Sequence, residues 1–349
     1  VQYMTCNAAA FTPGDRALVA FDGQAWDAPR VIGFADHPRP CNVVYVTADY
    51  QQVVDLPGGE QEIYLWGFVS LVDVGRREVI DSWYISNMFA FDGVTSLSGT
   101  PYLARAGAVG GSYQVLEDAT GGWPVLLPGT IASVQQTGDR LYGVAQSDDA
   151  YAPVAYRQHV AMSLAGGTVS ELRRWAIASG DGRLTTISPA GGHVAAGGYF
   201  GASSGYGVRV FDVATRAKIF EASLPPVVES VDLTDRYLCV AHWGPASTVD
   251  EITLWRRTES GYVPLSSTGV GRPVYSVAVV RDYVVASDGS RGALYVWRLD
   301  HGTGALSDFV EIAPYAAQLA ALPGNDLYSK FFPDGSGVSG HSVTAVRRP

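Results

Sequence analysis

Short apolar runs fill the chain from end to end, and clusters of turn residues separate them. Val, Tyr, Trp and Thr occupy the runs, whereas 40 glycines and 19 prolines supply the turns between them. No segment sustains a 3.6-residue hydrophobic period with capping residues at both of its ends. The pattern therefore predicts an all-β protein with very little helix.

Three segments in the second half of the chain repeat one pattern of strand, turn and strand. They read GVRVFDVATRAKIFEASL from Gly207, DEITLWRRTESGYVPLSS from Asp250 and GALYVWRLDHGTGALSDFVEI from Gly292. A second hairpin is expected upstream of each, beginning at Leu184, Val228 and Val274. Two consecutive hairpins make one four-stranded unit.

Weaker copies of this unit extend toward both ends of the chain. The positions that we align on the third strand of each copy lie 42 to 48 residues apart and are Val72, Val115, Ser163, Phe211, Trp255, Trp297 and Ala345. A repeat of about 40 to 50 residues with four strands is typical of a β-propeller. Seven aligned positions predict a seven-bladed propeller over residues 42–349.

The last repeat ends after its third predicted strand, so the ring needs one more strand to close. An open ring would leave strand edges unpaired, and an N-terminal segment is therefore expected to complete it. The candidates lie between Arg30 and Tyr50 and read VIGFAD and VVYVTAD.

The third-strand segments resemble WD40-type repeats, because Phe211 precedes Asp and both Trp255 and Trp297 precede Arg. The best single match is VRVFDVATRAKIFE. This resemblance implies the propeller architecture, whereas the partners of such proteins do not transfer with the fold.

Residues 11–41 read FTPGDRALVAFDGQAWDAPRVIGFADHPRPC and match no other unit of the chain. Two strands are expected here, ALVAF after the Pro13-Gly14-Asp15 turn and RVIGF before HPRPC. Their order resembles the small β-barrel modules of tail-tip and baseplate proteins of tailed bacteriophages, in which GDxVLVxF is followed by PxVIGF. The resemblance implies that residues 1–41 dock the chain onto a tail. In the alternative reading, residues 16–34 supply the closing strands of the ring.

The composition excludes several classes of partner. With 24 Lys and Arg against 34 Asp and Glu, the net charge of −10 disfavours nucleic acid and anionic membranes. No apolar run is long enough to span a bilayer, so membrane insertion is not expected, and no signal-peptide pattern opens the chain. Cys6, Cys41 and Cys239 are too scattered for a disulfide framework or a zinc site, and Cys239 is expected in the core.

The search for catalytic motifs finds neither a nucleophile elbow nor a phosphate loop. No three histidines are expected to converge, because His159 and His341 lie on third strands, His193 and His242 at opposite strand ends, and His37 and His301 in turns. The acidic candidates for a channel site, Glu229, Asp232, Asp235 and Asp282, are explained by solvated hairpin ends. We therefore expect no enzyme activity, no catalytic residue, no metal and no cofactor.

Aromatic residues in the predicted loops indicate an interaction surface. The two longest interruptions begin at Gln146 and Gly198 and combine tyrosines with Ala, Ser and Gly, a composition typical of antibody paratopes. The candidate binding residues are Trp26, Tyr151, Tyr156, Tyr199, Phe200, Tyr206 and Trp243.

The function predicted from these features is non-enzymatic. The chain is expected to be a bacteriophage tail or tail-tip protein, assembled in the host cytoplasm into the virion, with other tail proteins and a host-surface glycan or receptor as partners. It is expected to be multimeric within that assembly. Two alternatives remain: a metal-dependent, lactonase-like propeller hydrolase, and a free bacterial WD40-like scaffold.

Overall fold

All 26 described elements of the computed structural model are β-strands, and they form six four-stranded sheets and one two-stranded sheet. The structure describes residues 17–21, 29–34, 42–55, 57–86, 91–97, 100–105, 113–118, 120–122, 124–128, 131–137, 139–146, 156–165, 168–179, 181–225, 227–243, 250–271, 274–288, 293–314 and 338–345. Within these ranges no helix is long and apolar enough to cross a membrane.

We number the four-stranded sheets as blades, each written from its first to its fourth strand. Blade 1 contains β26 (Val338–Ala345), β3 (Val43–Asp55), β4 (Gln61–Asp73) and β5 (Glu78–Ser86). Blade 2 contains β6 (Phe91–Leu97), β7 (Thr100–Arg105), β8 (Tyr113–Asp118) and β9 (Val125–Pro128). Blade 3 contains β10 (Ile131–Thr137), β11 (Arg140–Gln146), β12 (Tyr156–Ala165) and β13 (Thr168–Ala176).

The other three blades follow in the same way. Blade 4 contains β14 (Arg183–Ala190), β15 (His193–Tyr199), β16 (Tyr206–Asp212) and β17 (Lys218–Ser223). Blade 5 contains β18 (Val228–Leu233), β19 (Tyr237–Trp243), β20 (Asp250–Thr258) and β21 (Gly261–Gly269). Blade 6 contains β22 (Val274–Val280), β23 (Tyr283–Asp288), β24 (Leu294–Leu299) and β25 (Leu306–Ile312).

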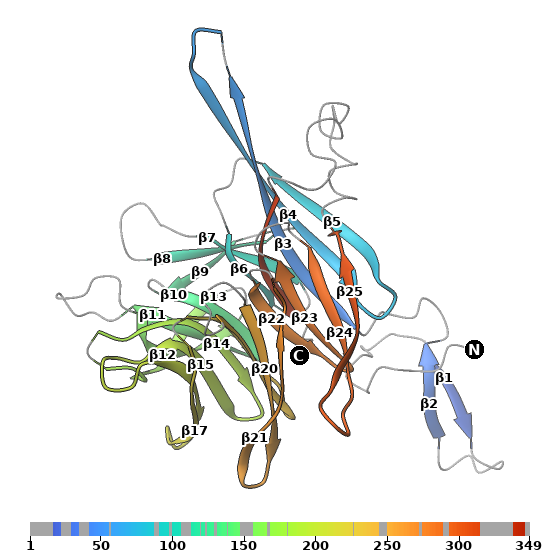
Figure 1. The fold of residues 1–349 in the computed structure, drawn as a ribbon, viewed down its shortest axis with the longest axis vertical. Coiled ribbons are helices and arrows are strands. Elements are labelled where there is room, and N and C mark those ends of the chain that lie inside the picture. Colours follow the sequence, from blue (N-terminus) through green and yellow to red (C-terminus); the bar gives the residue numbers. More distant parts are fainter. Residues whose placement is uncertain are drawn as a thin grey trace.

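The blades close into a ring, which is the arrangement of a β-propeller (Figure 1). Each first strand contacts the first strands of the two adjacent blades, in the cycle β26, β6, β10, β14, β18, β22 and back to β26. The prediction of an all-β propeller is confirmed, but the prediction of seven blades is wrong, because the described strands make six.

Blade 1 contributes two of the seven aligned positions, Val72 and Ala345. Six of the seven aligned positions do lie on third strands, namely Val72, Val115, Ser163, Phe211, Trp255 and Trp297. Ala345 instead lies on β26, the first strand of blade 1, where it is paired with Val44, which is paired in turn with Val72. The two ends of the chain therefore belong to one blade.

Blade 1 closes the ring by combining one C-terminal strand with three N-terminal strands. The segment VVYVTAD lies in β3 and pairs along β26, as one of the two predicted closures requires. The other candidate, VIGFAD, begins in β2 (Pro29–Phe34), which among the described strands pairs with β1 (Ala17–Phe21) and with no strand of the ring. The alternative that residues 16–34 close the ring is therefore wrong.

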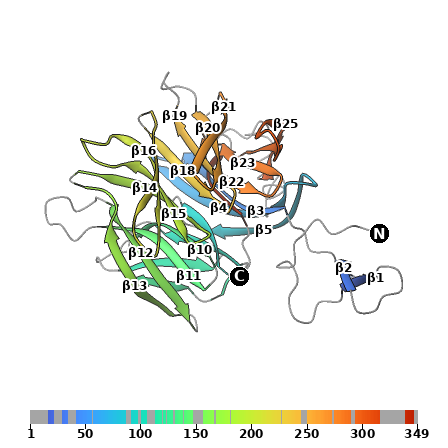
Figure 2. The same cartoon turned by 90° about the horizontal axis from the view of Figure 1, so that it is seen from below.

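The described N-terminal elements form a two-stranded antiparallel sheet of their own. Strands β1 and β2 stand apart from the ring in both views (Figures 1 and 2). The two described strands do not make a barrel, and the predicted boundary between residues 41 and 42 stays a prediction.

Polar side chains on the first strands join neighbouring blades. The free edge of each first strand carries backbone N–H groups that no strand pairs, and side-chain oxygens of the preceding blade accept from several of them. Between blades 4 and 5, the N–H groups of Val231 and Leu233 donate to Thr186 Oγ1 (3.2 Å) and Ser188 Oγ (2.8 Å). The N–H of Ile187 likewise donates to Ser133 Oγ of blade 3 (3.3 Å).

Asp232 occupies the centre of this inter-blade network. Its carboxylate accepts from the Val279 N–H of blade 6 (2.8 Å) and from the Ser188 hydroxyl of blade 4 (3.1 Å), so one side chain links three blades. Only 3% of Asp232 is exposed. The interpretation of Asp232 as a solvated hairpin end is therefore wrong, because its charge is buried and hydrogen-bonded.

The core lies between the blades. Buried Val, Ala and Leu side chains from one blade pack against those of the next, as in the cluster that joins Cys239 and Leu254 of blade 5 to Val277 and Tyr295 of blade 6. Cys239 is fully buried and burial raises the pKa of its thiol, which confirms its assignment to the core.

Antiparallel order gives the ring two faces of different character. In each blade the second strand ends and the third begins on one face, which we call the loop face. The turns that join first to second and third to fourth strands leave the opposite turn face. Figure 1 shows the β3–β4 hairpin, on the loop face, at the top and the β20–β21 and β24–β25 turns, on the turn face, lower in the view.

The β3–β4 hairpin extends past its own blade. β26 ends its pairing at Tyr50 and β5 at Trp66, whereas β3 and β4 continue to pair with each other up to Asp55 and Gln61. Residues 51–55 and 61–65 form a two-stranded arm that no other described strand pairs, with an exposed tip at 57–60.

We expect Asp232→Ala to lower the free energy of unfolding by about 1 to 3 kcal/mol, because it leaves a buried N–H and a buried hydroxyl without an acceptor. Urea denaturation monitored by tryptophan fluorescence measures the change. Asp139→Ala, in the exposed β10–β11 turn, is the control and should shift stability by no more than about 0.5 kcal/mol. Equal effects of the two substitutions would show that the network contributes nothing specific.

Candidate functional site

The predicted binding residues gather on the loop face as far as the structure describes them. Tyr199, Phe200 and Tyr206 belong to the β15–β16 connection, and Tyr156 and Trp243 occupy the loop-face ends of β12 and β19. The side chains of Tyr156 and Trp243 are not described. Trp26 and Tyr151 lie outside the described residues. The binding role of all seven stays a prediction.

Tyr199 and Tyr206 form a pair where β15 and β16 end. They oppose each other in the ladder, and their ring centroids lie 5.0 Å apart. The Tyr199 hydroxyl donates to Asp181 Oδ2 (3.2 Å), and desolvation together with the Asp181 carboxylate raises the pKa of that hydroxyl. Tyr206 is 38% exposed, so its ring is the part of the pair that a partner can reach.

Phe200 has a structural position within the same loop. It is 2% exposed and packs with Ile187 and Val194 in the core between blades 3 and 4. The Arg209 guanidinium carbon lies 4.2 Å from the centroid of its ring. The N–H of Phe200 also donates to the Gly205 carbonyl (2.9 Å), so the residue holds the loop against the core. A partner at the loop face cannot contact the buried ring without opening this core.

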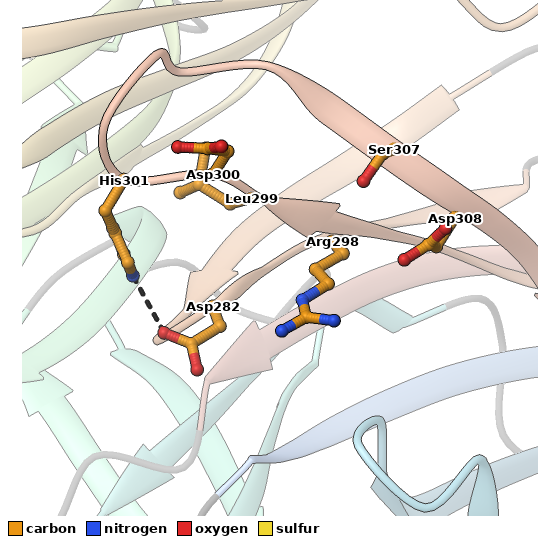
Figure 3. Close-up of a pocket in the computed structure, with 7 residues that line it drawn as sticks. All are labelled: Asp282, Arg298, Leu299, Asp300, His301, Ser307 and Asp308. Atoms are coloured by element: carbon orange, nitrogen blue, oxygen red, sulfur yellow. Dashed lines mark hydrogen bonds and ion pairs between the residues drawn. The ribbon is translucent and has the colours of Figure 1, made fainter.

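A pocket of about 480 Å³ lies on the opposite, turn face, and no sequence pattern indicated it. We call it the turn pocket; its lining residues all come from blade 6 and are Asp282, Arg298, Leu299, Asp300, His301, Ser307 and Asp308. The β22–β23 turn, the end of β24, the β24–β25 turn and the start of β25 supply them. Figure 3 shows the Arg298 guanidinium between the Asp282 and Asp308 carboxylates in the view drawn.

His301 holds one wall of the turn pocket in place. Its Nε2 lies 2.8 Å from Asp282 Oδ1, and its Nδ1 lies 2.7 Å from the Tyr237 hydroxyl of blade 5. Arg256, also of blade 5, donates to the carbonyls of His301 (2.6 Å) and Gly302 (3.0 Å). Both ring nitrogens of His301 are therefore occupied, and the imidazole has no free nitrogen to act as a general base.

Asp300 shapes the turn that carries His301. Its Oδ1 accepts from the N–H groups of Gly302 (2.7 Å) and Thr303 (3.0 Å). The Thr303 and Gly302 N–H groups lower the pKa of this carboxyl, so it is ionised at neutral pH and its charge is used within the turn.

Neighbouring turns of the same face are joined in a similar way. Arg173 of blade 3 donates to the Val213 carbonyl in the β16–β17 turn of blade 4 (2.9 Å). His193 lies 3.8 Å from Asp212 of the same blade, and burial followed by the charge of Arg257 in blade 5 lowers the pKa of its imidazole.

His159 lies on a third strand, as the sequence predicted. Its two ring nitrogens have no hydrogen-bond partner among the residues that the structure describes, and the ring is fully buried against Trp175, with centroids 3.8 Å apart. Burial, assisted by the charge of Arg173, lowers the pKa of His159 from 6.5 to about 3. His159 is therefore neutral in the folded protein near pH 7.

The histidines do not meet at a common centre within the described ranges. Those residues contain no group of three or more His, Cys, Asp or Glu side chains that could hold a metal ion. The side chains of His37 and His341 lie outside the described part of the chain.

No protein-family model matches the chain, and no curated protein matches it. Among solved structures, the chain is similar to one in the crystal structure of a nidogen/laminin complex, with 9% identity, 87% of this chain and 99% of that chain covered, and a TM-score of 0.52. It is also similar to the β-propeller domain of Myceliophteria thermophila Cps50 (Swd1), with 16% identity, coverage of 71% and 82%, and a TM-score of 0.44.

A further similar structure is the hydrazine synthase of Kuenenia stuttgartiensis, with 11% identity, coverage of 79% and 80%, and a TM-score of 0.46. At these identities the comparisons concern the fold alone. The similarity to the chain in the nidogen/laminin structure supports the overall arrangement, and the identification as a β-propeller rests on the closed ring of six sheets.

Two substitutions in the β15–β16 loop should distinguish a side chain that is packed in the core from one that is exposed at the surface. We expect Phe200→Ala to lower the free energy of unfolding by about 3 to 5 kcal/mol, because it empties a buried aromatic position. Tyr206→Ala, at an exposed position, should cost less than about 1 kcal/mol. Thermal and urea denaturation measure both, and a small effect of Phe200→Ala would contradict its position in the core.

His159 should make the protein acid-sensitive. Its pKa in the folded state lies below the unfolded value, so the unfolded chain binds the proton first and stability falls as the pH drops from about 6.5 toward about 3. The contribution is at most about 1.4 kcal/mol per pH unit. His159→Phe should flatten this part of the stability profile, measured by urea denaturation at several pH values. Met162→Leu, a buried substitution on the same strand that changes no ionisable group, is the control, and an unchanged slope in His159→Phe would contradict the assignment.

Proposed function

We propose that the chain is a non-enzymatic recognition and assembly protein of a tailed-bacteriophage virion. In this proposal the ring presents its loop face outward to a host-surface molecule. The N-terminal segment attaches the ring to neighbouring tail proteins, and the chain works as one subunit of a larger assembly.

The observation that carries the proposal is the separation of the N-terminal entry from the loop face. β3 begins at Val43 on the turn face, so the segment that precedes it reaches the ring from that side. The β3–β4 arm and the β15–β16 loop lie on the opposite side. A protein fixed at its N-terminus would therefore expose the loop face to a partner.

The N-terminal resemblance supplies the viral part of the proposal. The two strands that match GDxVLVxF and PxVIGF correspond to β1 and β2, which pair with each other and not with the ring. A separate two-stranded element before the first ring strand is compatible with an attachment role. The assignment to a tail rests on this resemblance and not on the propeller.

The loop face offers two kinds of contact. The arm at residues 51–55 and 61–65 carries strand edges that can pair with an extended segment of a partner. The ring of Tyr206, in blade 4, offers an exposed aromatic surface on the same face of the molecule. Both contacts continue directly from paired strands.

The test uses phage particles that carry the gene, with two altered forms of the protein supplied by complementation. In the first form, Asn-Gly replaces residues 53–63, which shortens the arm to a two-residue hairpin turn. This form should enter particles normally, as measured by gold-labelled antibody on the tail, while adsorption to host cells falls by about tenfold or more. In the second form, residues 1–41 are removed and incorporation should be lost.

The matched control is Asp139→Ala, which changes the turn face alone and should leave incorporation and adsorption unchanged. Absence of the unaltered chain from particles would overturn the virion assignment and favour a free bacterial scaffold. Stoichiometric metal in the purified protein together with metal-dependent lactone hydrolysis would overturn the non-enzymatic assignment. Normal adsorption with the shortened arm would contradict recognition by the arm.

A further inference from the structure

The turn pocket holds charged groups of both signs. The side chains of Arg298, Ser307 and Asp308 make no hydrogen bond or ion pair with any described residue. Asp282 uses one carboxylate oxygen for His301, which leaves the other oxygen available. These groups line one pocket of about 480 Å³, a size suited to a small ligand.

The local backbone places Asp308 at the pocket. β25 has an irregular register opposite β24, where Val296 pairs with Val310 but Arg298 pairs with Ser307. Asp308 lies in the resulting bulge with φ of 51°, a left-handed conformation that is unfavourable for most residues. Bulges redirect side chains, and here the bulged residue is one of those that line the pocket.

The adjacent blade supports the opposite wall. The Tyr237 hydroxyl and the Arg256 guanidinium of blade 5 hold the ring and the carbonyl of His301, and His301 in turn holds Asp282. Asp282 is therefore positioned by a chain of hydrogen bonds, although its side chain is 60% exposed. A ligand would meet a carboxylate whose orientation is already set.

The mixture of charges defines the chemistry of the ligand. A simple anion would be attracted by Arg298 but repelled by Asp282 and Asp308. A simple cation would pair with those carboxylates but leave Arg298 unpaired beside it. We propose that the turn pocket binds a small zwitterion of the α-amino-acid type, whose carboxylate pairs with Arg298 and whose ammonium group pairs with Asp282 and Asp308.

This site is independent of the recognition role proposed above, because it lies on the turn face and involves none of the loop-face residues. Its occupant would bridge the β22–β23 turn and the β24–β25 hairpin. Since the latter also contacts blade 5, a bound zwitterion would strengthen the join between blades 5 and 6.

Three probes of matched size test the proposal on the full chain: L-alanine, ethylamine and propionate. Ethylamine lacks the carboxylate of alanine, and propionate lacks its ammonium group. In NMR titrations that follow the Arg298 Nε–H signal, L-alanine should give a saturable shift in the millimolar range. Both analogues should bind about tenfold more weakly or worse, since each leaves one charge of the pocket unpaired.

Two variants localise the binding, with the thermal unfolding midpoint as the readout. Arg298→Gln and Asp308→Asn should each abolish most of the stabilisation by L-alanine, and asparagine tolerates the left-handed backbone at position 308. Arg236→Gln and Asp139→Asn, at exposed turn positions, should leave the response intact. Ethylamine binding as tightly as alanine, or no saturable response to alanine up to tens of millimolar, would overturn the proposal.

Discussion

The free edge of the first strand in each blade is the constraint on which the ring depends. A four-stranded sheet has two edges, and the inner one faces the neighbouring blades where water has little access. The protein satisfies part of this edge with hydroxyl and carboxylate oxygens from the preceding blade, such as Ser188, Ser230 and Asp232. Because each acceptor must lie opposite a particular N–H, these bonds set the height of one blade against the next.

The two faces inherit their properties from this stacking. Because the strands of each blade are antiparallel, every second strand ends and every third strand begins on the same side of the ring. Segments that are far apart in the sequence therefore share one surface. On the other side, short turns from adjacent blades meet, and side chains such as Arg173 and Arg256 reach across to the neighbouring turn. The connections of the loop face vary in length and composition, whereas neighbouring turns of the turn face are joined by hydrogen bonds.

Periodicity predicted the third strands correctly because Phe211, Trp255 and Trp297 mark equivalent positions in consecutive blades. It failed at Ala345, because a blade built from both chain ends presents its parts to the sequence as two incomplete repeats. The burial of Asp232 was missed for a different reason. A carboxylate after an apolar run has the same local pattern whether it faces water or a neighbouring blade, and only the packing of three blades distinguishes the two.

The candidate sites show the same limit of prediction from sequence patterns. Aromatic loop composition identified the Tyr199 and Tyr206 pair, but it could not separate them from Phe200, whose ring turns into the core. The turn pocket left no motif, because Asp282 comes from the β22–β23 turn, Arg298 from β24 and Asp308 from β25, and they meet only when blade 6 is folded.

The pairing of β26 with β3 ties the order of synthesis to the order of folding. Blades 2 to 6 are each continuous in the chain and can form as the polypeptide emerges from the ribosome, whereas blade 1 must wait for its innermost strand. Until that last strand arrives, the nascent chain carries a three-stranded sheet with an open apolar flank. Closure is then a long-range event over almost the whole polypeptide, and we expect it to be slower than the folding of the continuous blades and more exposed to misassembly.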